Sequence, residues 1–190
     1  MINIAVFASG NGSNAINIYN YFKNHSKIKF TCIYCNNPKA GIIEKSKGLS
    51  INCRVFNKVE WQTDVVTNEL ISQKIDFIIL AGFLWLIPSN LIKNFNNKII
   101  NIHPSLLPKY GGKGMYGENV HKSVILNKER ESGISIHIVN EKYDDGKIIF
   151  QKKITLTQNE TSETLATKIH ELEYLYFPEI IEKYIIGFNR

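Results

Sequence analysis

The chain opens with the apolar stretch Ile2–Ala8 (INIAVFA), which runs directly into the polar stretch Ser9–Asn14 (SGNGSN). An apolar run that ends in a glycine-rich turn is typical of a buried strand leading into a helix. We expect that helix to run from about Asn14 to His25. This strand, turn and helix begin an alternation of strands and helices, which predicts a parallel sheet.

The alternation continues through the first half of the chain, and the second half adds further strands and helices. Apolar runs predict strands at Phe30–Tyr34, Ile51–Phe56, Phe77–Leu80, Ile99–Ile102, Ile134–Val139 and Ile148–Ile154. Amphipathic stretches predict helices at Glu60–Gln73, Val120–Lys128 and Ser162–Tyr184, with Pro178 as a point of disturbance in the last. The fold class is therefore α/β: a doubly wound, mostly parallel sheet of about seven strands with helices on both faces.

Size and composition are those of one globular domain. The chain has 190 residues, of which 44% are hydrophobic and 21% charged, values that exclude disordered and fibrous designs. No stretch approaches the roughly 20 apolar residues of a membrane span, and the N-terminus lacks a signal-peptide pattern. We expect a single domain over residues 1–190, a cytoplasmic location and no membrane partner.

Charge and cysteine usage narrow the function further. The net charge of +6 comes from scattered lysines without a basic run interleaved with aromatics, so no nucleic-acid partner is expected. The three cysteines, Cys32, Cys35 and Cys53, are predicted to be reduced thiols. Cys32 and Cys35 lie three positions apart on a predicted strand and should face opposite ways, which argues against a shared metal.

The loop Ser9–Asn14 is a candidate anion site, because a helix N-terminus offers free amide donors and the positive end of the helix dipole. Gly10-x-Gly12-x-x-Ala15 also matches a dinucleotide fingerprint. That fingerprint needs an acid at the end of the second strand, where this chain has Cys35-Asn36-Asn37. The polar side chains of the loop suit a terminal monophosphate better, and a glycine turn without any ligand is the alternative.

The second candidate site lies at the end of the fifth strand, in the sequence Asn101-Ile102-His103-Pro104-Ser105. Residues two apart on a strand share a face, so Asn101 and His103 should project together at the edge where parallel sheets bind ligands. An amide donor beside an imidazole can hold an oxyanion and move a proton, as acyl transfer requires.

A carboxylate near His103 would raise the pKa of the imidazole by favouring its charged form. Asp144 and Asp145 are the candidates. A purely structural histidine at a strand end is the alternative. His121 and His137 are weaker candidates for a functional role, and His25 and His170 read as solvent-facing helix residues.

Several spaced motifs resemble the phosphoribosylglycinamide formyltransferases of de novo purine synthesis. They are Ser9–Asn14, Leu80–Phe83, Asn101–Tyr110 and Tyr143–Gly146, followed by the segment from Glu173 to Pro178. The resemblance covers nearly the whole chain. It implies a Rossmann-like formyltransferase fold, with nucleotide and phosphate binding in the N-terminal half and with folate binding and catalysis in the C-terminal half.

The resemblance also implies a reaction and its residues. The reaction moves a formyl group from the co-substrate 10-formyltetrahydrofolate to the amine of glycinamide ribonucleotide, without a metal, in a monomer or homodimer. The implied catalytic residues are Asn101, His103 and Asp144. The implied substrate-binding residues are Asn11, Gly12, Ser13 and Asn14 for the phosphate and Glu173 for the ribose. The implied folate-binding residues are Leu84, Trp85, Leu86, Ile87 and Asn101.

The resemblance departs at Trp85, where relatives often carry a basic residue. The residues that bind the folate tail are therefore not predicted. Methionyl-tRNA formyltransferase shares the Asn-x-His-Pro motif but carries an RNA-binding domain, for which we expect this chain to end too early. Formyltetrahydrofolate hydrolase usually has a regulatory domain before the catalytic one, which we expect to begin here at Met1. A non-catalytic binding module is the alternative from another class.

Overall fold

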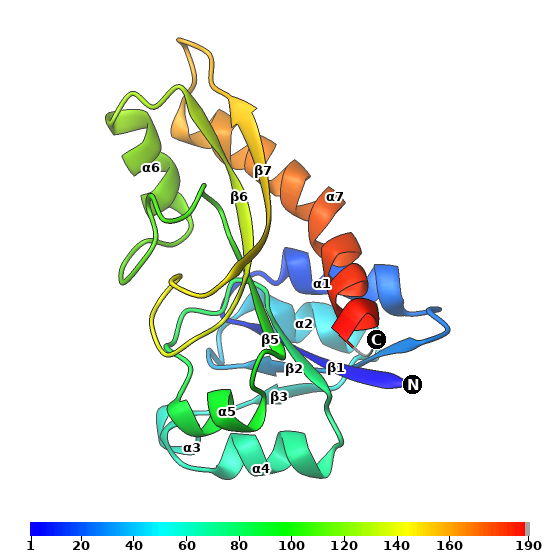
Figure 1. The fold of residues 1–190 in the computed structure, drawn as a ribbon. Coiled ribbons are helices and arrows are strands. Elements are labelled where there is room, and N and C mark those ends of the chain that lie inside the picture. The colour runs from blue at the N-terminus through cyan, green and yellow to red at the C-terminus, as the bar shows by residue number, and fades with distance from the viewer. Residues whose placement is uncertain (189–190) are drawn as a thin grey trace. The chain divides into compact units, whose positions relative to one another are not determined.

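The computed structural model describes residues 1–188, which form two compact units. The first unit is Met1–Ile100, and the second begins at Asn101. The seven strands follow the sheet order β3-β2-β1-β4-β5-β6-β7. The predicted α/β class with a seven-stranded, mostly parallel sheet is therefore confirmed (Figure 1).

The first unit is built on parallel strands. β1 pairs in parallel with β2 and with β4, and β2 pairs in parallel with β3. The bounds of its strands are β1 Ile2–Ala8, β2 Ile28–Cys35, β3 Cys53–Val55 and β4 Phe77–Leu80. β1 and β4 are almost entirely apolar and buried, as expected for strands covered on both faces.

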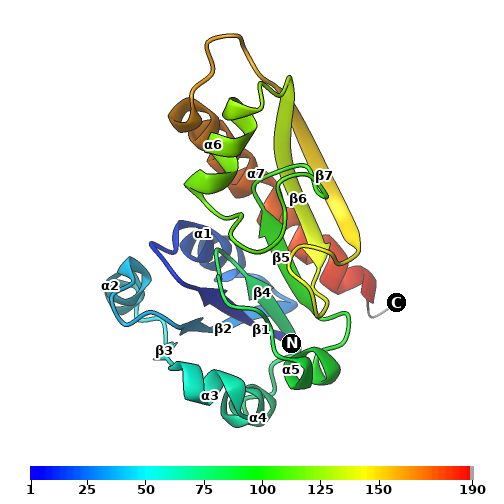
Figure 2. The ribbon, with the colours of Figure 1, turned by 90° about the vertical axis from the view of Figure 1, so that its left-hand side faces the viewer.

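Helices cover both faces of these strands (Figures 1 and 2). The pair α1 and α2 lies on one face, and α3, α4 and α5 lie on the other. Their bounds are α1 Ser13–Phe22, α2 Gly41–Gly48, α3 Lys58–Gln62, α4 Val65–Ser72 and α5 Ser89–Asn94. An aromatic group around Phe7, which stacks on Tyr34 with ring centroids 4.9 Å apart, fills the core beneath the carboxyl end of β1.

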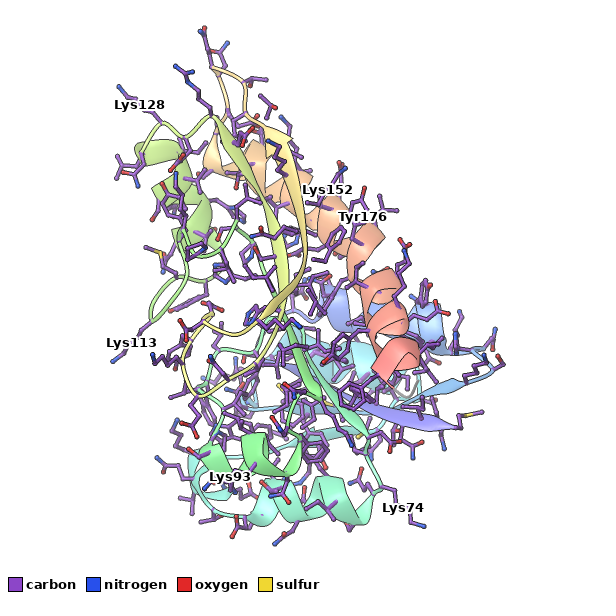
Figure 3. The ribbon with its side chains drawn as sticks, viewed as in Figure 1. Lys74, Lys93, Lys113, Lys128, Lys152 and Tyr176 are labelled. Atoms are coloured by element: carbon purple, nitrogen blue, oxygen red, sulfur yellow. The ribbon has the colours of Figure 1, made fainter. Side chains whose placement is uncertain are left out.

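The second unit contains an antiparallel pair of strands packed on a long helix. β6 pairs antiparallel with β7, and α7 packs against β6 (Figure 1). Lys152 on β7 and Tyr176 on α7 lie side by side, with the ammonium 5.7 Å from the ring centroid (Figure 3). The remaining bounds are β5 Ile99–His103, α6 Glu118–Leu126, β6 Glu131–Ile138, β7 Ile148–Thr155 and α7 Ser162–Phe188.

All seven predicted strands are present, with ends shifted by no more than three residues. Two short helices, α2 and α5, were not predicted. The predicted helix Glu60–Gln73 is wrong as a single element, since α3 and α4 are separate helices. α3 begins earlier because Asn57 and Glu60 form a capping box, and it ends where the Thr63 hydroxyl bonds the Val59 carbonyl and the backbone becomes extended.

α7 continues through Pro178 without a break, so the expected disturbance is absent. Apart from the buried Pro178, its buried side chains recur every fourth residue, namely Leu165, Ile169, Glu173, Phe177, Ile181 and Ile185. Packing of this stripe stabilises the helix beyond what one missing backbone donor costs. Within residues 1–188 no helix, α7 included, has both the length and the apolar character needed to cross a membrane.

A substitution at Gly133 can test how closely β6 approaches β7. A Cβ at this position would lie 2.0 Å from the Lys152 carbonyl oxygen, inside the antiparallel ladder. We therefore expect Gly133→Ala to lower the free energy of unfolding by about 2 kcal/mol or more, because the ladder must distort. The measurement is the midpoint of denaturant unfolding.

Gly187→Ala is the matched control within the same unit. A Cβ there meets nothing within 4 Å, and the residue lies in α7. Since alanine is the better helix former, this variant should gain roughly 0.5–1 kcal/mol. Equal stabilities for the two variants would contradict the close approach of the strands.

Candidate active site

Asn101 and His103 leave β5 on a shared side, as the two-residue periodicity predicts. Ile102 between them is buried, and the His103 ring is also buried. Both polar side chains approach the same carboxyl group, that of Asp144. The Asn101 amide nitrogen is 3.4 Å from Asp144 Oδ1, and His103 Nδ1 is 3.5 Å from the same oxygen.

Asp144 is the carboxylate of the cluster, and Asp145 is not. The Asp144 side chain is only 11% exposed, and its Oδ2 accepts a 2.9 Å hydrogen bond from the Gly112 backbone N–H. The exposed Asp145 carboxylate instead accepts from Asn140 at 3.1 Å. The turn between β6 and β7 thus delivers one carboxylate to the end of β5.

His137 joins this group, a contact that the sequence did not reveal. Its Nδ1 donates to the Ile138 carbonyl at 3.1 Å, which leaves Nε2 as an acceptor. The Asn101 amide donates to that Nε2 at 3.0 Å. His137 therefore orients the Asn101 side chain, and its Nε2 lies 3.6 Å from Asp144.

Both amide hydrogens of Asn101 are engaged, but unequally. The bond to His137 has normal length, whereas the 3.4 Å contact with Asp144 is at the weak limit for a hydrogen bond. The hydrogen that faces Asp144 is consequently the one that Asn101 can offer to another acceptor at little cost.

Burial sets the protonation of the two central groups. The pKa of His103 is lowered below its ordinary value, because burial disfavours the imidazolium more strongly than Asp144 and the Tyr110 carbonyl favour it. The carboxylate acts to raise this pKa, as expected, but burial outweighs it because the ring is almost completely removed from water. Burial acts to raise the pKa of Asp144, but the neighbouring imidazoles of His137 and His103 and the hydrogen bond from the Gly112 N–H outweigh it, so its pKa is lowered. At neutral pH the pair is a carboxylate and a neutral imidazole.

A hydrogen-bond network holds the segment after β5 that orients His103. His103 Nε2 donates to the Tyr110 carbonyl at 2.7 Å. Ser135 on β6 donates to the Ser105 carbonyl at 2.6 Å and accepts from the Leu107 N–H at 2.9 Å. Gln151 on β7 donates to the Leu107 carbonyl at 3.0 Å. The imidazole is thereby tied through its own chain to two strands.

The loop Ser9–Asn14 lies in the first unit, at the carboxyl end of β1. Gly12 has φ 70°, and a Cβ on it would lie 2.3 Å from Ile42 of α2, so only glycine fits. The N-cap Gly12 offers no side-chain hydrogen bond to α1 and no acid occupies its first turn, so the positive end of the helix dipole is not opposed by a local carboxylate. Lys45, which the sequence reasoning missed, places its ammonium 2.6 Å from Asn11 Oδ1.

The segment Leu84–Ile87 follows β4 in the same unit. Leu84 and Leu86 are 43% and 42% exposed, while Ile87 is buried. Backbone groups are fixed at both ends: the Leu84 N–H donates to Ser9 Oγ at 3.0 Å, and the Leu86 carbonyl accepts from the Trp61 indole at 2.9 Å. The segment is thus a held backbone with two exposed apolar side chains.

Trp85 in this segment carries a cation above its ring. The Lys58 ammonium lies 4.4 Å from the ring centroid, within cation–π distance. The indole packs edge-on against Phe56 at 5.9 Å. A positive charge is therefore present at Trp85 although the residue itself is neutral.

Glu173 lies in the second unit, buried in the stripe of α7. Its carboxylate accepts a 2.9 Å hydrogen bond from the exposed His170, whose pKa is raised by this bond.

The cysteines are free thiols. Cys32 contacts Gln73 and Cys35 contacts the Asn37 carbonyl, and residues 1–188 contain no cluster of three histidine, cysteine or acidic side chains that could hold a metal.

The class of protein is a formyl-group transferase: the chain belongs to the formyl transferase family, whose model matches residues 2–181. It is 38% identical over 188 residues to phosphoribosylglycinamide formyltransferase, chloroplastic, from Vigna unguiculata, covering 94% of this chain and 59% of that protein. It is 35% identical over 196 residues to the phosphoribosylglycinamide formyltransferase of Bacillus subtilis strain 168. That match covers 100% of this chain and 97% of the relative.

A solved structure of phosphoribosylglycinamide formyltransferase from Bacillus halodurans matches with a TM-score of 0.85 and 30% identity, covering 95% of this chain and 94% of that one. The chain spans about three fifths of the length of the two plant relatives it matches. The resemblance inferred from the four motifs is confirmed.

The lowered pKa of His103 can be measured directly. Titration of its ring protons by NMR, assigned with the variant His103→Gln, should give an apparent pKa below the ordinary value of 6.5. Asp144→Asn should lower it further, because the loss of the carboxylate leaves burial unopposed. A value above 6.5 in the wild type would contradict the dominance of burial.

Proposed function

We propose that this protein transfers the formyl group of 10-formyltetrahydrofolate to the amine of N1-(5-phospho-D-ribosyl)glycinamide, a step of purine biosynthesis. The observation that carries the proposal is the buried group of Asn101, His103 and Asp144 in a chain of the formyl transferase family. Relatives that match nearly the whole chain are named for this substrate.

The chemistry needs an acceptor for negative charge and a route for one proton. The folate supplies the formyl group; a carbon–nitrogen bond to the amine forms as the bond to the folate nitrogen breaks. Asn101 donates its loosely held amide hydrogen to the carbonyl oxygen as negative charge develops there. His137 keeps that amide in place throughout.

His103 is the proton carrier in this proposal. Its neutral ring takes the proton that the attacking amine loses and returns it to the departing folate nitrogen. Asp144, 3.5 Å from Nδ1, stabilises the imidazolium while the proton is held. No nucleophilic side chain or metal is needed for this transfer.

Phosphate and pterin binding are assigned to the first unit. Asn11, Gly12, Ser13 and Asn14 would hold the phosphate at the N-terminus of α1, and Lys45 adds a cation beside Asn11. The pterin would lie against the segment Leu84–Ile87, whose exposed side chains and fixed backbone suit a flat heterocycle, with Asn101 as a further contact. Glu173 would bind the ribose.

The remaining assignments follow from this reaction. The two units act as one formyltransferase domain spanning residues 1–190. The partners are the two small-molecule substrates, without nucleic acid or membrane, and the protein works in the cytoplasm as a monomer or a homodimer. The small-molecule partners agree with a purine-pathway enzyme, and the scattered lysines agree with the absence of a nucleic-acid partner.

The test of the proposal is turnover. The protein is mixed with glycinamide ribonucleotide and 10-formyltetrahydrofolate, and folate absorbance is followed together with formation of the N-formyl product. Folate deformylation without the amine would indicate a hydrolase, and binding of both compounds without any reaction would indicate a non-catalytic module.

Variants in the two units should separate catalysis from binding. His103→Ala and Asp144→Asn should lower kcat by about a hundredfold or more, since the first removes the proton carrier and the second removes the charge that stabilises its imidazolium. Asn14→Ala should mainly raise KM for the ribonucleotide. Steady-state kinetics distinguish these patterns, and an unchanged kcat in His103→Ala would remove His103 from its role.

The Lys58–Trp85 pair predicts how the folate tail is bound. If Lys58 supplies the cation for the glutamate carboxylates, Lys58→Met should raise KM for the folate roughly three- to tenfold at low salt, with little change in kcat. Lys58→Met with Trp85→Arg should restore the affinity by returning the charge.

Lys74→Met is the control, because Lys74 precedes the amino end of β4 whereas Trp85 follows its carboxyl end. It should leave KM for the folate unchanged. A similar rise in KM for both single variants would point to a general field effect instead of a tail site.

A further inference from the structure

The segment from Tyr110 to Gly112 supplies one hydrogen bond to each member of the His103–Asp144 pair. The Tyr110 carbonyl accepts the 2.7 Å bond from His103 Nε2, and the Gly112 N–H donates the 2.9 Å bond to Asp144 Oδ2. The backbone of this short segment therefore helps to decide where both groups are held. Any shift of the segment would reach the imidazole and the carboxylate together.

Tyr110 has a backbone conformation that residues with a side chain seldom adopt. Its φ is 57°, in the left-handed region. Such a conformation persists only where the surrounding structure holds it, and it occurs often at functional sites. The direction of the Tyr110 carbonyl depends on the backbone angles of this residue. The groups that hold Tyr110 in place therefore also aim the acceptor of the His103 bond.

Two residues beyond the end of α6 hold the Tyr110 side chain. Its hydroxyl donates to Glu129 Oε1 at 2.9 Å and accepts from the Asn127 amide at 3.0 Å. The Glu129 backbone N–H is itself bonded to the Val124 carbonyl of α6 at 3.2 Å. The hydroxyl is thus tied to the helix as both a donor and an acceptor. We call Tyr110, Asn127 and Glu129 the tyrosine anchor.

The bond to the Tyr110 carbonyl selects one of the two neutral forms of His103. Because Nε2 donates to Tyr110, Nδ1 carries a lone pair and is the nitrogen that can take a proton. Nδ1 lies 3.5 Å from Asp144 Oδ1, longer than the roughly 2.7–2.9 Å of a charge-assisted hydrogen bond, as expected when no hydrogen lies between them. In the other tautomer Nδ1 would donate to the carboxylate and would already be occupied.

We propose that the tyrosine anchor holds His103 in the proton-accepting tautomer and is thereby a positioning element for formyl transfer. This inference rests on the proposed function, in which the neutral ring of His103 takes the proton of the amine. A carboxylate is a stronger hydrogen-bond acceptor than a carbonyl. Without a well-aimed Tyr110 carbonyl, the ring proton would therefore reside on Nδ1 and bond Asp144. The anchor opposes that shift from outside the reacting centre.

The charge of Glu129 suits this role. The Lys109 ammonium and the Tyr110 hydroxyl lower the pKa of Glu129, so its carboxylate is an acceptor only. Burial raises the pKa of Tyr110, so the phenol keeps its proton and remains the donor of the bond. Lys109 contacts the same Glu129 oxygen at 2.9 Å, but its side chain is 67% exposed.

Tyr110→Phe removes the hydroxyl and keeps the ring. Nitrogen-15 NMR of the neutral His103 ring, assigned with His103→Gln, should show the proton on Nε2 in the wild type and mainly on Nδ1 in Tyr110→Phe. Because only the remaining reactive tautomer can take the proton, kcat should fall about tenfold, with KM for both substrates within about twofold of the wild type. An unchanged tautomer would overturn the proposal.

Glu129→Gln and Glu129→Leu separate the hydrogen bond from the charge. Glutamine keeps an oxygen that accepts from the hydroxyl, so this variant should retain the tautomer and the kcat of the wild type. Leucine has no acceptor, so Glu129→Leu should shift the ring proton toward Nδ1 and lower kcat roughly three- to tenfold. Tyr110→Phe combined with Glu129→Leu should be no slower than Tyr110→Phe alone, since both act through one bond. Additive losses would overturn a shared anchor.

Lys109→Met is the matched control, since it removes a cation from the same Glu129 oxygen and leaves the tyrosine intact. An exposed ion pair contributes little, so the tautomer and kcat should stay at their wild-type values. An effect equal to that of Tyr110→Phe would indicate the charge of Glu129 instead of the bond, and would overturn the proposal. So would a Tyr110→Phe variant that only melts at a lower temperature, as a merely structural role predicts.

The tautomer is read without turnover, so this proposal and the proposed function fail separately. A wild-type protein that transfers no formyl group, but in which Tyr110→Phe moves the ring proton to Nδ1, would refute the proposed function and support the anchor. Formyl transfer at an unchanged rate in Tyr110→Phe would refute the anchor and leave the proposed function intact.

Discussion

A buried carboxylate must be surrounded by hydrogen-bond donors, and the geometry of the second unit follows from this constraint at Asp144. The Gly112 backbone supplies one donor, the Asn101 amide supplies a second, and two imidazoles lie within 3.6 Å. Removal of any one group would leave charge in a place that water does not reach. Three separate segments, namely the end of β5, the loop after it and the turn between β6 and β7, are therefore held to one point.

The groups that surround the carboxylate are themselves oriented by hydrogen bonds. Asn101 is oriented by His137, whose own tautomer is fixed by the Ile138 carbonyl. His103 is oriented by the Tyr110 carbonyl, at the end of a loop that Ser135 and Gln151 anchor. Each reacting group thus has one bond that fixes its position and one direction left open, which is the preorganisation that charge stabilisation in a transition state requires.

The sequence predicted those parts of the site that depend on local periodicity. Asn101 and His103 share a side because strands alternate, and strands such as β1 and β4 were found because buried parallel strands are continuous apolar runs. His137 was only a weaker candidate in the sequence, because its role depends on a contact between β5 and β6 that no local pattern encodes. The division of Glu60–Gln73 into two helices escaped because Glu60 serves as a capping residue instead of a helix interior. The net lowering of the His103 pKa was missed because the depth of burial is a property of the assembled fold, whereas the opposing effect of a neighbouring carboxylate could be predicted from the chain.

At Trp85 the positive charge comes from a neighbouring residue and not from the residue at that position. A basic side chain at this position would carry its own charge, whereas here an indole face holds the ammonium of Lys58, which begins α3. The neighbouring cation, Arg54, cannot take that part because it is paired with Glu60 and Glu69. An aromatic ring preserves the sign of the local field and adds apolar surface, so the position gains stacking area without losing attraction for anions. Residue identity at one position is for that reason a weaker guide to such a site than the charge that the folded chain assembles around it.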